Sequence, residues 1–109
     1  MRHDADRISD ILDAIEKIQS RLTTREIFDS DEMLRVWCLH HIVVIGEAAS
    51  RISESFRKQN ENIPWRRIVA MRNAVVHGYF KVDWAQVWVV VETELTPLQQ
   101  QLSPIYSQM

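Results

Sequence analysis

The sequence predicts an all-α protein: an up-down bundle of four main helices with a short C-terminal helical extension. The chain has 109 residues with only two Gly and three Pro, so it has few places to turn sharply. Apolar residues recur at steps of three and four along most of it, which is the helical period. With 46% apolar residues at this length, we expect one domain over residues 1–109 with a single modest core.

The first helix is expected from about Asp4 to Arg21. One apolar stripe explains it through core packing alone, and that stripe consists of Ile8, Ile11, Leu12, Ile15, Ile18 and Leu22.

The second helix is expected to start where Asp29 and Glu32 form a capping-box pattern, and to run to about Arg57. At 1.5 Å per residue it would be about 40 Å long. Its middle section, residues 36–49, is apolar nearly all the way round, unlike a surface helix. We therefore expect a second subunit to cover it, in a homodimer.

The third helix is expected to begin at Pro64, whose missing N–H costs nothing at a first helical position. It should end near His77, because Gly78 can adopt the left-handed conformation that closes a helix.

Asp83 and Gln86 form another capping pattern, which opens a fourth helix. Its Val-rich part, residues 87–91, lacks the alternation of a strand and is interpreted as helix. Pro97 either kinks this helix or, with Thr96 as a cap, restarts a short one before a loose C-terminus.

Composition excludes several classes of function. A formal net charge of −2 provides no global field for nucleic acid, so any RNA contact must be local. A solvated surface is the simpler interpretation of Arg57, Lys58 and Arg67 taken alone. The sequence offers two basic clusters for such contact, namely Arg51, Arg57 and Lys58, and Arg66, Arg67 and Arg72.

The environment expected for this protein is the cytoplasm. Its apolar run at residues 42–49 is too short to span a bilayer, and its first ten residues are charged, so we expect no membrane association. Cys38 is the lone cysteine, so it forms neither an internal disulfide nor a thiolate metal site, and it is expected to be packed in the interior.

Arg72 is the anomaly of the sequence, because it falls in the middle of the apolar arc of the third helix. A buried, unpaired guanidinium costs several kcal/mol, so Arg72 must be paired or must face a cleft. The structural interpretation is an ion pair with Glu47 of the second helix, and on Arg72 alone that interpretation is favoured.

The neighbours of Arg72 point to chemistry. Asn73 and His77 are four residues apart on one helix edge, so the amide can fix the imidazole tautomer. At a helix C-terminus the dipole favours the imidazolium, which suits proton exchange near neutral pH. On a regular helix Arg72 and His77 point about 140° apart, so a two-fold dimer is needed to bring both around one substrate. Tyr79 adds a hydroxyl, or is a half-buried loop tyrosine.

Other groups carry no expected function. His40 and His41 diverge by about 100° on a helix and do not chelate a metal, and one of them is expected in the core or an interface. Two glycines cannot form a phosphate loop, and no nucleophile motif is present. We expect no metal and no cofactor.

The run from Arg72 to Tyr79, Arg-Asn-Ala-Val-Val-His-Gly-Tyr, is similar to the R-x-x-x-x-H-x-Y motif of HEPN-domain toxins of the HepT type. Three further segments resemble that family in the same order along the chain: Ile45-Gly46-Glu47-Ala48, Ile63-Pro64-Trp65 and Val87-Trp88.

The resemblance implies a HEPN-like dimer whose paired motifs form a metal-independent endoribonuclease cleft that cuts RNA and not DNA. By carry-over, Arg72 and His77 are catalytic and Asn73 supports them. Tyr79 would accept AMP groups from an MntA-like nucleotidyltransferase antitoxin, in a type VII toxin–antitoxin system. Two alternatives stay open: a non-catalytic substrate-binding subunit of a nucleotidyltransferase, and a plain dimeric adaptor.

Overall fold

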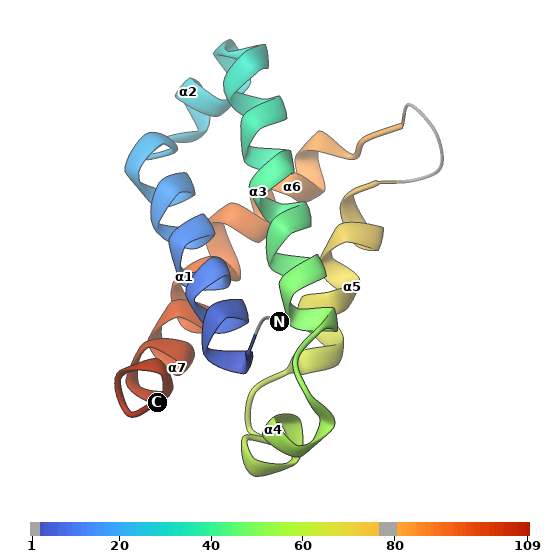
Figure 1. The fold of residues 1–109 in the computed structure, drawn as a ribbon. Helices are drawn as coiled ribbons and strands as arrows, with labels where there is room; N and C mark the ends of the chain where they lie inside the picture. The colour runs from blue at the N-terminus through green and yellow to red at the C-terminus, as the bar shows by residue number, and fades with distance from the viewer. Residues whose placement is uncertain (1–2, 77–80) are drawn as a thin grey trace.

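The computed structural model describes residues 3–76 and 81–109 and shows an all-α chain, as predicted (Figure 1). The helices of these residues are α1 (Asp4–Arg21), α2 (Arg25–Ser30), α3 (Glu32–Ser50), α4 (Glu54–Gln59), α5 (Trp65–Val75), α6 (Trp84–Thr93) and α7 (Leu95–Ser107).

The helices pack as a four-helix bundle in which α1, α3 and α5 are three of the helices and α6 and α7 together take the place of the fourth. α3 lies between α1 and α5, α6 packs on α5, and α7 packs on α1 (Figure 1). α6 and α7 also pack on each other. The predicted four-helix bundle is thus confirmed, with its last helix broken in two. The fully buried large side chains of the core are Ile8, Ile11, Ile15, Ile18, Phe28, Ile42, Ile45, Ile63, Val75, Val87, Leu95 and Leu102.

The first helix has the bounds that its periodicity predicts. α1 runs from Asp4 to Arg21 and buries the isoleucines of its stripe. The acidic first turn and the basic last turn both complement the helix dipole.

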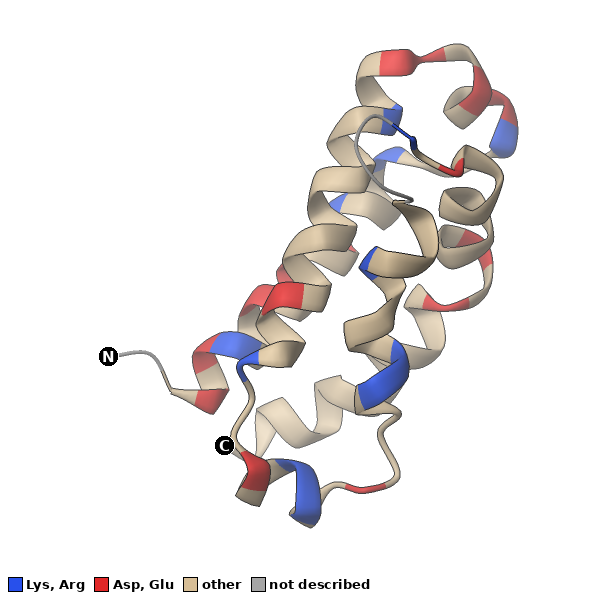
Figure 2. Cartoon of the chain, turned by 90° about the vertical axis from the view of Figure 1, so that its right-hand side faces the viewer, with Lys and Arg blue, Asp and Glu red and all other residues tan. Residues whose placement is uncertain are grey.

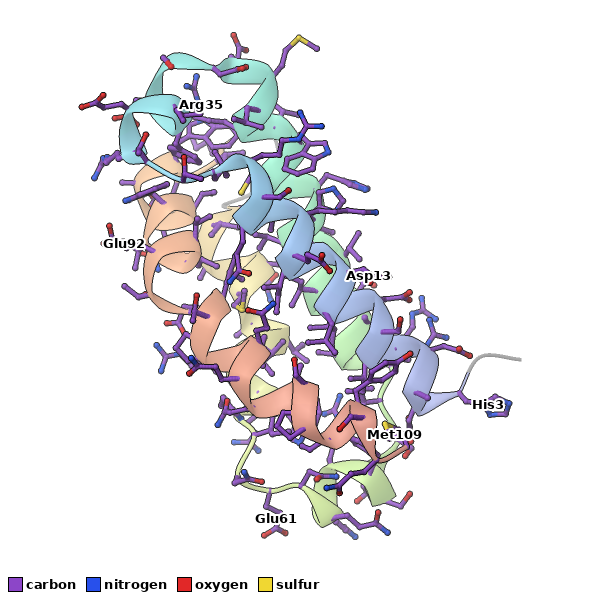
Figure 3. The ribbon with its side chains drawn as sticks, turned by 90° about the vertical axis from the view of Figure 1, so that its left-hand side faces the viewer. His3, Asp13, Arg35, Glu61, Glu92 and Met109 are labelled. Carbon is purple, nitrogen blue, oxygen red and sulfur yellow. The ribbon has the colours of Figure 1, made fainter. Side chains whose placement is uncertain are left out.

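The prediction that one long helix begins at Asp29 is wrong. The chain forms the short helix α2 first, and α3 then begins with Asp31 as its cap, whose carboxylate accepts from the backbone N–H of Leu34 at 3.0 Å. Asp29 instead pairs with Arg25, at 3.4 Å. Arg35 holds the bend between the two helices, because its Nη1 donates to the carbonyls of Phe28 and Asp29 at 3.0 and 2.7 Å (Figure 3).

The predicted C-terminal bound of that helix, near Arg57, is also wrong. α3 ends at Ser50, and Ser53 caps the separate helix α4 by accepting from the backbone N–H of Phe56. Asp4 of α1 accepts from both the backbone N–H and the hydroxyl of Ser53. Arg57 turns back to donate to the carbonyl of Ala49 at 2.6 Å, so an end carbonyl of α3 gains a partner.

Contacts within one chain explain why α3 is apolar on nearly all sides. Because α1 and α5 pack on α3, its residues Ile42, Ile45 and Ala49 are buried by this chain itself. The large apolar side chains that stay exposed on α3 are Met33 and Val36, near its start. The apolar middle section therefore does not by itself require a second subunit.

The C-terminal part is more ordered than predicted. The cap formed by Asp83 on Gln86 is confirmed at 3.0 Å, and the Val-rich segment is helical. The helix does restart near Pro97, but it does so at Leu95 without Thr96 as its cap, and α7 continues to Ser107 instead of fading into a loose end. Its buried leucines explain that extent, since they pack against α1.

Membrane insertion finds no support among the described helices. Within residues 3–76 and 81–109, none of them combines the length and the apolar character that a transmembrane segment needs.

Candidate functional site

The candidate site lies at the C-terminal end of α5. This helix ends at Val75, two residues before the predicted end at His77, and Val76 follows in an extended conformation with φ −115° and ψ 117°. Arg72 therefore stands in the last helical turn, where its positive charge complements the helix dipole. Because the helix stops at Val75, the angle of about 140° expected between Arg72 and His77 on a continuous helix does not apply.

Arg72 is exposed and is not part of the core. Its Nη1 donates to the Oδ1 of Asn73 at 3.2 Å, and it forms no ion pair with Glu47, which is itself exposed. The expectation of a buried Arg72–Glu47 pair is therefore wrong. A long side chain at the edge of an apolar face can extend its charged end into water, and Arg72 does so.

Gly46 of α3 explains how the base of Arg72 is held. A Cβ built at Gly46 would lie 3.6 Å from the Cβ of Arg72 and 3.6 Å from the carbonyl oxygen of Val69. The two helices thus meet closely at this level, and the stem of Arg72 stands directly over Gly46. The backbone of α3 therefore contacts the stem of Arg72, at the place where an ion pair with the adjacent Glu47 was expected.

The chain that follows α5 is closed at its base. Val76 and Val82 form an isolated antiparallel β-bridge, and the backbone N–H of Asp83 donates to the carbonyl of Val75 at 2.8 Å. The intervening motif residues His77, Gly78 and Tyr79 lie outside the described residues, so their expected roles stay predictions.

The start of α6 packs against α2 and α3. Trp84, its first residue, contacts Phe28 edge to face with the ring centroids 6.4 Å apart. The guanidinium of Arg35 lies 5.7 Å from the centroid of the Trp84 ring, a cation–π contact. No local sequence pattern marks Arg35, one turn after the cap Asp31, because its partners come from α2 and α6.

Some residues of the two predicted basic clusters have ion-pair or hydrogen-bond partners in the described chain, and others have none. Lys58 pairs with Glu54 at 3.4 Å, Arg57 is half-buried against α3, and Arg67 forms an ion pair with Glu94. Arg51 and Arg66 are exposed and form no side-chain ion pair or hydrogen bond with the described residues. A solvated charged surface is thus too simple for Arg57 and Arg67, which both bridge helices.

The remaining titratable residues of α3 fit structural roles. His41 is buried, with 8% of its surface exposed, and its ring packs edge to face on Trp37 at 4.6 Å, whereas His40 is exposed. Burial, then the charges of His40 and Lys17, lower the pKa of His41. Cys38 is fully buried, which raises the pKa of its thiol to about 12 and keeps it protonated. Among the described residues, no three His, Cys, Asp or Glu side chains gather in a group that could hold a metal ion.

Two cavities among the described residues are lined by α5 without Arg72. One of about 220 Å³ opens between α5 and α7, and another of about 180 Å³ lies between α5 and α6. Both are on the flank of α5 opposite Gly46, with Arg67 and Met71 in the wall between them. Arg72 lines neither of them and is exposed.

Comparisons with known proteins agree on one family. Residues 8–105 match the family described as "Ribonuclease HepT-like". A relative from Thermococcus cleftensis, named a probable ribonuclease HepT, is 33% identical over 102 residues, covering 90% of this chain and 91% of its own. A candidate RNase from Methanocaldococcus jannaschii is 29% identical over 75 residues, covering 69% of both chains. Another from Caldanaerobacter subterraneus is 30% identical over 80 residues, covering 73% of this chain and 71% of its own. No solved structure matches.

Proposed function

Because this chain belongs to the HepT-like ribonuclease family, we propose that it is a metal-independent endoribonuclease, the toxin of a type VII toxin–antitoxin pair. One observation carries this proposal: the family match spans residues 8–105 and includes the Arg72-to-His77 motif, whose arginine is exposed at the end of α5. We propose further that it acts as a toxin in the cytoplasm and needs no metal ion.

The chemistry proposed is transphosphorylation within RNA. His77 takes the proton from a ribose 2′-hydroxyl as that oxygen attacks the adjacent phosphorus, and the bond to the 5′-oxygen of the next nucleotide breaks. Arg72 stabilises the negative charge that develops on the phosphoryl oxygens. The products are a 2′,3′-cyclic phosphate and a 5′-hydroxyl, the second of which takes up a proton. Since the nucleophile is a 2′-hydroxyl, DNA is not cut.

The structure supports the part played by Arg72. Its guanidinium is unpaired by any carboxylate of the described chain, so its full charge is available to a phosphate. The neighbouring Oδ1 of Asn73 orients it with a 3.2 Å hydrogen bond. Glu47, one residue from the contact between α3 and Arg72, is a supporting residue in this proposal.

The cleft is proposed to form between two copies of the chain, with Arg72 of one copy and His77 of the other at one phosphodiester. Neutralisation is proposed to occur when an MntA-like nucleotidyltransferase transfers AMP to Tyr79. An added AMP places bulk and negative charge beside Arg72, which repels RNA.

Cleavage of RNA in the presence of EDTA tests the enzymatic proposal. The wild type should yield cyclic phosphate and 5′-hydroxyl ends on RNA and leave DNA of the same sequence intact. His77→Ala should lose about 10²-fold or more in rate, as expected for an acid–base group. His40→Ala is the matched control, because it removes an exposed histidine from α3 and should retain full activity. Absence of cleavage by the wild type would favour a non-catalytic partner of a nucleotidyltransferase.

Mixing two inactive variants tests the shared cleft. Arg72→Ala and His77→Ala copies, unfolded and refolded together, form mixed dimers in which one cleft has an intact Arg72 and an intact His77 from different copies. Random pairing gives about a quarter of the wild-type number of intact clefts. If both groups of a site come from one copy, no mixed dimer has an intact cleft and the mixture stays inactive.

Modification is tested by co-expression with the nucleotidyltransferase followed by mass spectrometry. The wild type should gain AMP on the peptide that contains Tyr79, and Tyr79→Phe should not. An AMP adduct that persists in Tyr79→Phe would place the modification elsewhere.

A further inference from the structure

The outward face of α5 carries positive charge beyond the motif. This helix contains three arginines and no Asp or Glu, and Figure 2 shows Lys and Arg segments at both of its ends. Arg66 in its first turn is exposed, and within residues 3–76 and 81–109 it has no ion-pair or hydrogen-bond partner. A free arginine at this place is not required by the packing of the bundle.

Arg66 and Asn73 share one face of the helix, and Arg72 stands about 120° around the helix from Arg66, beside Asn73. Arg66 and Asn73 are seven residues apart, which is 20° short of two full turns, so they point in nearly the same direction about 10.5 Å apart. Asn73 in turn holds Arg72 through the 3.2 Å hydrogen bond. Ala70 and Val69 flank the line between them, and Ala70 is exposed whereas Val69 is half-buried.

The adjacent arginine does not compete for this role. Arg67 is one residue away, on the side of Arg66 that faces away from Arg72, and its charge is paired with Glu94, the C-cap of α6. That ion pair also neutralises Glu94. Among the arginines of α5, those left without a carboxylate partner in the described chain are therefore Arg66 and Arg72.

We propose that the RNA strand binds along the surface of α5 from Arg72 and Asn73 back to Arg66. Arg66 then binds a phosphate a few nucleotides from the scissile one. The inference rests on the proposed ribonuclease function and adds a binding subsite to it. A planar guanidinium suits a phosphate, and the low side chain of Ala70 lets the sugar-phosphate backbone lie against the helix. The subsite reads charge and not base identity.

Length of the substrate separates the subsite from the motif. A dinucleotide reaches only Arg72 and His77, whereas an oligoribonucleotide of about ten nucleotides also reaches Arg66. We expect Arg66→Gln to raise KM for the longer RNA about threefold to tenfold without changing kcat, and to leave cleavage of the dinucleotide unchanged.

Arg67→Gln is the matched control, because it removes the same charge from the next residue. It should change KM for the longer RNA by less than about twofold, since Glu94 already neutralises Arg67. Equal effects of the two variants would show a diffuse electrostatic contribution and would overturn the subsite. Thermal unfolding of both variants checks that the bundle is intact.

Binding measured without cleavage separates this inference from the proposed function. In a His77→Ala background, Arg66→Gln should weaken binding of the same oligoribonucleotide about threefold to tenfold. It should also lower the slope of log Kd against log salt by about 0.7, the value for one phosphate contact on a single strand. Unchanged binding and slope overturn the subsite even if the wild type cleaves RNA. A wild type that binds through Arg66 but cleaves nothing overturns the nuclease proposal alone.

Discussion

The backbone N–H of Asp83 donates a 2.8 Å hydrogen bond to the carbonyl of Val75, and this bond joins the last residue of α5 to the cap of α6. Together with the bridge between Val76 and Val82, it fixes both ends of the segment that contains the rest of the motif. The side chain of Asp83 accepts from the backbone N–H of Gln86 at 3.0 Å, so one residue binds the end of α5 and caps the next helix.

Replacing Asp83 by Ala should therefore affect activity as well as stability. Loss of the cap costs about 1 kcal/mol of folding free energy. Because the start of α6 is also joined to the end of α5 by the Asp83–Val75 hydrogen bond, we expect RNA cleavage to fall about tenfold under conditions where the chain stays folded. Urea unfolding and a cleavage assay on the same preparation measure the two effects.

Asp31 provides the matched control for Asp83. It caps α3 with the same group and the same 3.0 Å distance, through its Oδ1 and the backbone N–H of Leu34, but it lies at the α2–α3 bend and not at the motif. Asp31→Ala should lose similar stability with little change in cleavage. Equal losses of activity in the two variants would show that Asp83 acts through stability alone.

The stability of the chain should fall in mild acid because of His41. Burial lowers its pKa in the folded protein, with smaller contributions from His40 and Lys17, so the unfolded chain binds a proton more readily. The stability held by neutral His41 is complete above the unfolded pKa of about 6.5 and is lost as the pH falls below it. The slope is at most about 1.4 kcal/mol per pH unit for one group.

Urea unfolding between pH 5 and pH 8, taken in steps of about one unit, measures this dependence. His41→Phe keeps an aromatic ring against Trp37 and should flatten the curve, whereas His40→Gln should retain most of the slope because His40 is exposed. A His41→Phe curve as steep as that of the wild type would assign the acid sensitivity to other groups.

Cys38 should be inert in the native protein. Its thiol is fully buried and its pKa is raised to about 12, so almost no thiolate is present at pH 8. We expect a thiol reagent to label Cys38 only as fast as the chain unfolds, and urea to accelerate labelling to the rate of a free cysteine. Rapid labelling without denaturant would show that α3 separates locally from the core.

The helices that sequence patterns predict well are those whose signals are local. The stripe of α1 and the cap at Asp83 depend on residues within a few positions of each other, and the structure confirms both. The break after Ser50 depends on Asp4, which binds Ser53 from 49 positions away, and on Arg57 reaching back to Ala49. Periodicity carries no information about such contacts.

The candidate site likewise combines features that local sequence predicts with features that depend on distant contacts. The motif residues and their place at the end of a helix follow from the sequence, but the surroundings of Arg72 do not. A helical projection put Arg72 on the apolar face, whereas its side chain leaves that face at the edge where Gly46 brings α3 close. The partner of its guanidinium is the adjacent Asn73, because Glu47 stays in solvent.

Gly46 itself gives a last prediction, because its side-chain space is sufficient for one methyl group. The Cβ of an alanine would meet the Cβ of Arg72 and the carbonyl oxygen of Val69 at 3.6 Å, which is ordinary van der Waals contact. Gly in a helix interior costs about 0.5–1 kcal/mol relative to Ala, so Gly46→Ala should stabilise the chain by about that amount with activity retained. Gly46→Leu adds atoms that do not fit between α3 and α5, and it should destabilise the chain by about 1–3 kcal/mol and displace Arg72. Thermal unfolding and RNA cleavage of both variants test this. A loss of stability in Gly46→Ala would mean that the space beside Gly46 is too small for a methyl group, so that α3 and α5 lie closer together than the 3.6 Å contacts indicate.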